Sequence, residues 1–334
     1  MLEDLCIHIG NRNGLKTLTS NKSRLYYLFS SLIKHVPNIN HAEVLFSDNE
    51  SEDDSCNFFK KLGIGTIVNR PIIRVEPKWL QTTLNNQLNI SDAIQQTNKK
   101  FFWNIENDSY FFRSEFIQQA LDVLSTREDI VIVNLRYWIS LDKKDWIGIP
   151  KNLSRYDACS KTPSGTTFYE LERRDCDVLW IDVTNDISQD FCFDDKHDPM
   201  HCVLSDELKV GNIRNTPDGK YQRLLNEHWN TYASHGYIAR TDTLRFIIER
   251  YQPLSERNMS MMVRKHFKAA KLEMDAFFSF GWNKRVQNVN EKDIEKMILY
   301  CENTPCSSMK EIGTFINSSN VTIYNESQSR VSIL

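Results

Sequence analysis

The sequence predicts an α/β fold in which a mainly parallel central sheet is flanked by helices. Short apolar segments, typical of buried strands, alternate with longer segments whose apolar residues recur every three or four positions, as in amphipathic helices. Three predicted strands run directly into polar or acidic residues. With 334 residues, of which 40% are hydrophobic and 25% are charged, the chain is long enough for one large globular domain, or for one domain with an appendage.

The first predicted unit is a strand, a helix and a second strand. Leu5–Ile9 is a short apolar run that ends at Gly10, which predicts a buried strand followed by a loop. A helix is expected at Leu25–Val36, because its apolar residues have helical spacing and Pro37 follows them. Glu43–Phe46 is the next strand. Two strands joined by a helix form a βαβ unit, which implies a parallel sheet with a right-handed crossover.

The same alternation continues to residue 135, and it weakens beyond that point. Polar loops dominate from residue 140 to 230, with one clear strand at Val178–Val183. Regular periodicity returns at Gly236 and includes a helix at Asp293–Tyr300. The remaining expected strands are Ile72–Val75, Phe101–Ile105 and Ile130–Leu135, and the remaining expected helices are Cys56–Leu62, Ile90–Thr97 and Phe116–Leu124.

Charge and cysteine content exclude several classes of protein. The net charge of −3 creates no global field that would attract nucleic acid or an anionic membrane. The eight cysteines include no C-x-x-C pair, which argues against a zinc ribbon or a redox motif. The acidic N-terminus lacks the features of a signal peptide, and no apolar run reaches the ~18 residues that cross a bilayer. We therefore expect a soluble, cytoplasmic protein with reduced cysteines and no membrane span.

Polar segments follow three of the predicted strands. They are Gly10 to Asn13, Asp48 to Asp54 and Glu106 to Asp108. In open α/β sheets, ligands bind outside the carboxyl ends of the strands, so these segments are expected to converge on one edge. Carboxylates gathered there would repel each other unless a cation or hydrogen-bond donors offset their charge. The later part of the second segment, Glu52 to Asp54, also has the pattern of a solvated helix start.

Two of these segments resemble family 2 glycosyltransferases. Glu43 to Asp54 is similar to the part of that family that ends the second strand, where an acidic residue precedes an Asn/Gly-Ser turn and further acidic residues. Glu106-Asn107-Asp108 resembles the D-x-D motif of the same family. The resemblance implies a GT-A-like, Rossmann-type fold. It implies a nucleotide-sugar-binding half at 1–135, a more irregular acceptor-binding half of the same domain at 136–302, and a C-terminal tail at 303–334.

The resemblance also implies a role for individual residues on the donor side. Asp48 would accept hydrogen bonds from the nucleotide base, and Asn11 and Arg12 would line the same pocket. Asp108 would ligate Mn²⁺ or Mg²⁺, bridging the two phosphates of the sugar nucleotide, because hard cations prefer carboxylate oxygen. Glu106 would hold the ribose or a metal-bound water. Glu106 stands where the family usually has Asp, so the metal role is assigned to Asp108.

On the acceptor side the resemblance is to a glycine-led strand at Gly236 to Thr241 and to a later acidic motif at Ser255-Glu256-Arg257. In inverting members of the family that acidic residue is the general base, which makes Glu256 the first candidate. The usual acidic pair is missing, so Asp242 and Glu249 are rivals.

The implied reaction is metal-dependent transfer of a sugar from a UDP- or GDP-linked donor to an acceptor hydroxyl, with inversion. The Q-x-x-R-W motif of processive synthases is absent, which favours a non-processive enzyme. The acceptor stays open among a glycan, a lipid-linked sugar, a protein and a modified nucleobase. Two alternatives also stay open. One is a nucleotidyltransferase acting on a sugar phosphate, for which Gly10 to Gly14 is a partial loop match. The other is a non-catalytic nucleotide-sugar-binding module, consistent with Glu at position 106.

Overall fold

The computed structural model describes residues 2–16, 22–75, 78–135, 156–171, 178–182, 214–215, 221–225, 236–253, 259, 262–263, 266–274, 276–279 and 291–303. The helices are α1 (Arg24–His35), α2 (Ser55–Leu62), α3 (Lys78–Gln96), α4 (Phe116–Thr126), α7 (Thr241–Tyr251) and α9 (Glu291–Asn303). The strands of the central sheet are β1 (Leu5–Asn11), β2 (Glu43–Asp48), β3 (Thr66–Asn69), β4 (Phe101–Glu106), β6 (Ile130–Asn134), β7 (Tyr156–Lys161), β8 (Thr167–Leu171), β12 (Tyr237–Arg240) and β13 (Lys268–Leu272). The remaining strands are β5 (Ser109–Phe111), β9 (Val178–Asp182), β10 (Arg214–Asn215), β11 (Tyr221–Leu225) and β14 (Phe277–Ser279).

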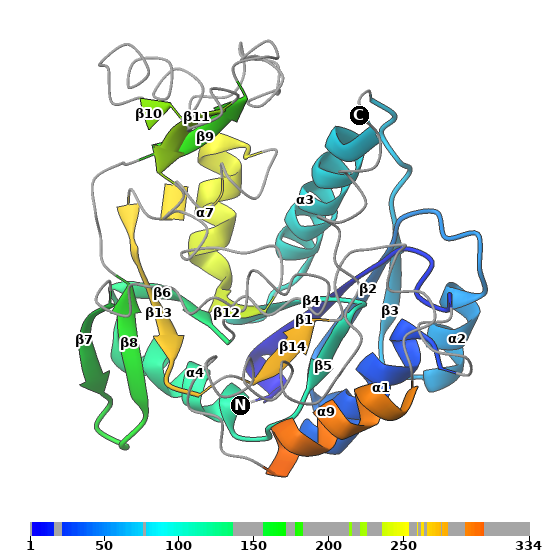
Figure 1. The fold of residues 1–334 in the computed structure, drawn as a ribbon, viewed down its shortest axis with the longest axis horizontal. Coiled ribbons are helices and arrows are strands. Elements are labelled where there is room, and N and C mark those ends of the chain that lie inside the picture. Colours follow the sequence, from blue (N-terminus) through cyan, green and yellow to red (C-terminus); the bar gives the residue numbers. More distant parts are fainter. Residues whose placement is uncertain are drawn as a thin grey trace.

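Within the described residues, nine strands form one mixed sheet in the order β3-β2-β1-β4-β12-β6-β13-β8-β7 (Figure 1). The strands β3, β2, β1 and β4 are parallel to one another, and β13 is parallel to β6. Strand β12 lies antiparallel between β4 and β6, so a strand from the later part of the chain completes the sheet begun by the first part. The mainly parallel sheet flanked by helices confirms the predicted fold class.

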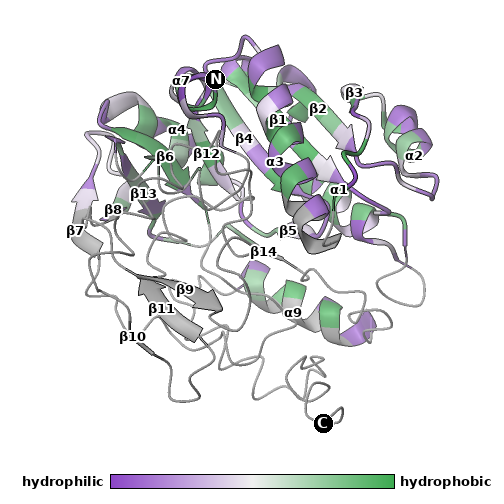
Figure 2. Cartoon of the chain, turned by 90° about the horizontal axis from the view of Figure 1, so that it is seen from above, coloured by the Kyte–Doolittle hydropathy of each residue, from purple (hydrophilic) through white to green (hydrophobic). Residues whose placement is uncertain are grey.

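Helices cover both faces of the sheet because successive strand residues point to opposite sides. Ile7 belongs to the core cluster beneath α1, α2 and α4, whereas its neighbour Cys6 belongs to the cluster beneath α3 and α7. Figure 2 shows that the helices are amphipathic, with green apolar stripes beside purple polar ones.

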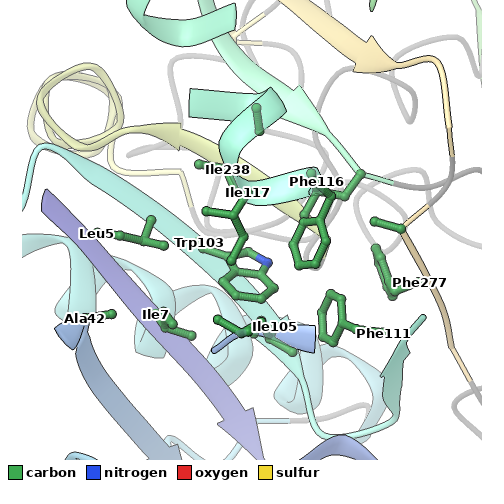
Figure 3. Packing of buried hydrophobic residues seen from close by; sticks show 14 of the residues in the cluster. Leu5, Ile7, Ala42, Trp103, Ile105, Phe111, Phe116, Ile117, Ile238 and Phe277 are labelled. Atoms are coloured by element: carbon green, nitrogen blue, oxygen red, sulfur yellow. The ribbon is translucent and has the colours of Figure 1, made fainter. Parts of the chain in front are cut away.

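An aromatic group on the first face holds β5 and β14 against β4. The Trp103 ring lies edge-on to Phe111 and to Phe116, with centroids 5.0 and 5.3 Å apart, and Phe277 packs on Phe111 (Figure 3). Because β5 begins directly after Asp108, this packing also positions the turn that contains the predicted metal ligand.

Most of the predicted elements are present, with different lengths in several cases. The predicted helix at Ile90–Thr97 is the last part of the longer α3. The predicted strand at Val178–Val183 is β9, which belongs to a separate sheet with β10 and β11, and Val183 lies outside the described residues.

The predicted strand at Ile72–Val75 is wrong, because β3 forms at Thr66–Asn69 instead. The side chain of Asn85 on α3 forms hydrogen bonds with both backbone groups of Ile73. Its Nδ2 donates to the Ile73 carbonyl, and its Oδ1 accepts from the Ile73 N–H, both at 2.9 Å. Because the N–H and carbonyl of Ile73 already have hydrogen-bond partners, they are not available to pair with a neighbouring strand.

Candidate functional site at the carboxyl edge of the sheet

The carboxyl ends of β2, β1 and β4 lie level with one another. In the register of the sheet Asn11 is opposite Asp48, and Gly10 is opposite Glu106. Backbone hydrogen bonds continue past the strands, from Asn49 N to Asn11 O at 2.9 Å and from Asn107 N to Gly10 O at 3.1 Å. The predicted convergence of the three polar segments on one edge is therefore confirmed.

Asn11 joins the three strand ends through its side-chain amide. Its Nδ2 donates to Asp48 Oδ1 at 2.7 Å, and its Oδ1 accepts from Asn107 Nδ2 at 2.8 Å. All three side chains are buried, with exposed fractions of 2%, 6% and 9% for Asn11, Asp48 and Asn107. Arg12 lies next to this joint, since its carbonyl oxygen accepts from Asn107 Nδ2 at 3.3 Å. The structure thus brings together Asn11, Asp48 and the backbone of Arg12, and their role toward a nucleotide base stays a prediction.

Asp48 is surrounded by donors from its own chain. Its Oδ1 accepts from the Ser51 hydroxyl at 2.5 Å in addition to Asn11, and its Oδ2 accepts from the Ser51 N–H at 2.8 Å. The thiol of Cys56 also faces this carboxylate. Burial, together with the charge of Asp48 and a hydrogen bond to it, raises the pKa of Cys56 to about 11. Neutral donors therefore offset the buried negative charge.

The acidic segment after Asp48 divides into residues with different surroundings. Asp53 ties the β1 loop to the start of α2, because its Oδ2 accepts from Leu15 N at 2.9 Å and its Oδ1 from Ser55 N at 3.1 Å. Asp54 is exposed at the N-cap of α2 and accepts from Asn57 Nδ2 at 2.5 Å. Asp53 and Asp54 directly precede α2, as expected for a helix start, and Asp48 is the acidic residue of the segment that contacts Asn11.

Asn107 and Asp108 form the turn between β4 and β5. Asp108 is 3% exposed, and Glu106 is half-buried. The strand after the turn is held by two helices: Phe111 N donates to the Ser31 hydroxyl of α1 at 3.1 Å, and the Tyr110 hydroxyl donates to Glu302 of α9 at 3.0 Å. The position of Asp108 is therefore fixed by elements far apart in the sequence.

A buried histidine contacts side chains on both strands next to β1, and it was not among the site residues predicted from the sequence. His8 on β1 contacts Asn104 Oδ1 through Nδ1 at 2.5 Å and Ser47 Oγ through Nε2 at 2.8 Å. Burial lowers the pKa of His8 from 6.5 to about 4, against a smaller opposing effect of its hydrogen bond to Asn104. The available signal was a histidine inside an otherwise apolar strand.

Asparagines of α3 form a second group that was missed. Asn49, next to Asp48, accepts from Asn89 Nδ2 at 2.7 Å and donates to Asn86 Oδ1 at 3.1 Å. The neighbouring Gln87 is 2% exposed. A run of Asn and Gln in a helix that packs on a sheet was the signal that could have found them.

Of the acceptor-side candidates, Asp242 does not lie at this edge. Asp242 begins α7, where Thr241 N donates to the carbonyl of Lys100 just before β4. The site lies at the other end of β4, so this placement argues against Asp242 as the general base. Glu249 is exposed on α7, and Glu256 lies outside the described residues.

Among the described residues, no group of three or more His, Cys, Asp or Glu side chains could hold a metal ion by itself. No helix in the described part of the chain is long and apolar enough to cross a membrane.

Comparisons with known proteins give similarities of fold. No protein-family model matches the chain, and no curated protein matches it. One similar solved structure is Staphylococcus aureus TarS 1-349 in complex with UDP-GlcNAc, with 11% identity, a TM-score of 0.42, and coverage of 92% of this chain and 69% of that one. Another is glucosyl-3-phosphoglycerate synthase from Mycobacterium tuberculosis with Mn²⁺, UDP-glucose and phosphoglyceric acid, with 17% identity, a TM-score of 0.29, and coverage of 39% and 42%.

A third is CMP:2-keto-3-deoxy-manno-octonic acid synthetase complexed with CTP, with 11% identity, a TM-score of 0.39, and coverage of 88% of this chain and 97% of that one. At these identities and TM-scores, the assignment of an activity depends on the residues of the site itself.

Proposed function

We propose that this chain is a metal-dependent glycosyltransferase. It would move a sugar from a nucleoside diphosphate sugar to an acceptor hydroxyl, one sugar at a time and with inversion. The main support is the joint at the carboxyl edge of three parallel strands, where Asn11 links Asp48 to the turn that contains Asp108. Ligands of open α/β sheets bind at this edge. A buried carboxylate held by neutral donors suits a base, and a separate pair of carboxylates suits a divalent cation that would in turn hold a diphosphate.

The carboxylates at the end of β4 and in the turn after it fit a divalent cation. Glu106 and Asp108 offer hard carboxylate oxygens, which Mg²⁺ and Mn²⁺ prefer. Because the described residues contain no complete protein cage, the ion would take its other ligands from the diphosphate and water, as Mg²⁺ commonly does. Asp108 is the proposed ligand, and Glu106 would hold the ribose or a metal-bound water. When bound, the ion neutralises the charge that develops on the leaving diphosphate.

The remaining roles belong to the chain's own side chains. Asp48 accepts a hydrogen bond from the base, and Asn11 and Arg12 line that pocket. Glu256 is the proposed general base: it takes the proton of the acceptor hydroxyl as the oxygen bonds to the anomeric carbon. The bond from that carbon to the diphosphate breaks, and its electron pair leaves with the diphosphate.

A hydrolysis and binding screen tests the proposal. Purified protein with Mn²⁺ is incubated with UDP- and GDP-linked sugars, and the release of nucleoside diphosphate is measured beside calorimetric binding of UDP and GDP. The absence of both nucleotide binding and sugar-nucleotide hydrolysis would refute the proposal. Product formation from a nucleoside triphosphate and a sugar phosphate would identify a nucleotidyltransferase instead. Nucleotide binding without turnover on any acceptor would indicate a binding module.

A further inference from the structure

We infer that the base pocket selects uracil over guanine, an inference that rests on the proposed function. The reason is the small number of lone-pair sites on the Asp48 carboxylate that donors of the chain leave open to a ligand. An ionised carboxylate offers about four lone-pair sites, two on each oxygen. Asp48 Oδ1 already accepts from Asn11 Nδ2 at 2.7 Å and from the Ser51 hydroxyl at 2.5 Å, which uses both of its sites.

The second oxygen of Asp48 keeps one site for a ligand. Among the described residues, Oδ2 accepts a backbone hydrogen bond from Ser51 N at 2.8 Å. The thiol of Cys56 is the other donor that faces the carboxylate. A thiol is a weak donor, so a base N–H can replace it at small cost.

The two bases differ in the number of donors on the edge that such a carboxylate would meet. Guanine presents two adjacent N–H groups, N1–H and N2–H, which need one acceptor on each carboxylate oxygen. Uracil presents a single N–H between two carbonyl oxygens. Because Oδ1 is already occupied, guanine would bury one N–H without a partner, whereas uracil would bury none. A buried donor without a partner costs enough to change affinity about tenfold or more.

The direct test compares UDP with GDP on the wild-type chain by calorimetry in Mn²⁺. The two ligands share the ribose and the diphosphate, so the ratio of their Kd values reports the base alone. We expect UDP to bind at least about tenfold more tightly than GDP. Equal affinities, or tighter GDP binding, would overturn the inference while leaving the proposed function intact. If neither UDP nor GDP binds, both the proposed function and the inference are refuted.

A variant tests the cause of the preference. Asn11→Ala removes one donor from Asp48 Oδ1 and should reduce the ratio of the two Kd values toward one, even if both affinities fall. Asn57→Ala is the matched control, because Asn57 also donates an amide N–H to a carboxylate, that of exposed Asp54, outside the site. A wild-type ratio in Asn11→Ala, with the fold verified by circular dichroism, would contradict the lone-pair count.

Discussion

Lowering the pH should destabilise the fold through His8, and the size of the effect follows from its surroundings. The ring is 1% exposed and its pKa is lowered by burial from 6.5 to about 4. A depressed pKa means that the unfolded chain binds the proton more readily, so the contribution of His8 to stability is complete above pH 6.5. It is lost as the pH falls through about 4. At ~1.4 kcal/mol for each tenfold difference in proton affinity, the loss amounts to about 3 kcal/mol.

The assay is urea unfolding at a series of pH values between 7 and 4. His8→Gln cannot titrate, so the free energy of unfolding of the wild type should fall by about 3 kcal/mol more than that of the variant over this range. His41→Gln is the matched control, because it replaces an exposed histidine with the same side chain. If the curves of the wild type and His8→Gln are parallel, His8 does not resist protonation and the reasoning from burial is refuted.

Three further predictions concern the site and its frame. Asp108→Asn should reduce Mn²⁺-dependent sugar-nucleotide hydrolysis by about a hundredfold or more while circular dichroism stays unchanged, and unchanged turnover would exclude the metal role. Glu256→Gln should lower kcat by a similar factor with little change in the Kd of the donor, and an equal loss in donor binding would contradict a general base. Gly236→Ala should cost more than ~2 kcal/mol in urea unfolding, because φ is 78° and the added Cβ would overlap the Phe277 ring. Gly165→Ala, with φ of 96° and open space around it, should cost ~1 kcal/mol. Equal losses of unfolding free energy in the two variants would show that the overlap with Phe277 does not contribute.

The parts of the fold that sequence predicts well are those whose periodicity has one explanation. The apolar residues of α1 repeat at helical spacing over its whole length, and four of the five residues of the strand at Phe101–Ile105 are apolar. The outer strand was misplaced because Thr66–Asn69 and Ile72–Val75 are both short segments rich in β-branched residues. The choice between them depends on Asn85, which binds the backbone of the second run. Such a contact between distant residues leaves no periodic signal.

The site was predicted in outline and not in its chemistry. A family resemblance directs attention to carboxylates, so Asp48 and Asp108 were the residues proposed from the sequence. Asn107 was treated as the variable middle residue of a motif, yet its amide makes the contact that joins β4 to β1. His8 was hidden inside an apolar strand, where a buried neutral ring fits without disturbing the pattern.

The amide of Asn11 also divides the site into two electrostatic parts. On the β2 side, neutral donors already compensate the charge of Asp48. On the β4 side, Glu106 and Asp108 depend on a cation in the proposed function. Removing metal with a chelator should therefore weaken UDP binding by about tenfold or more and leave uridine binding unchanged, because uridine lacks the diphosphate. Calorimetry with both ligands, before and after chelation, checks this. An equal loss for uridine would mean that the cation also organises the base pocket, and the two parts would then act as one.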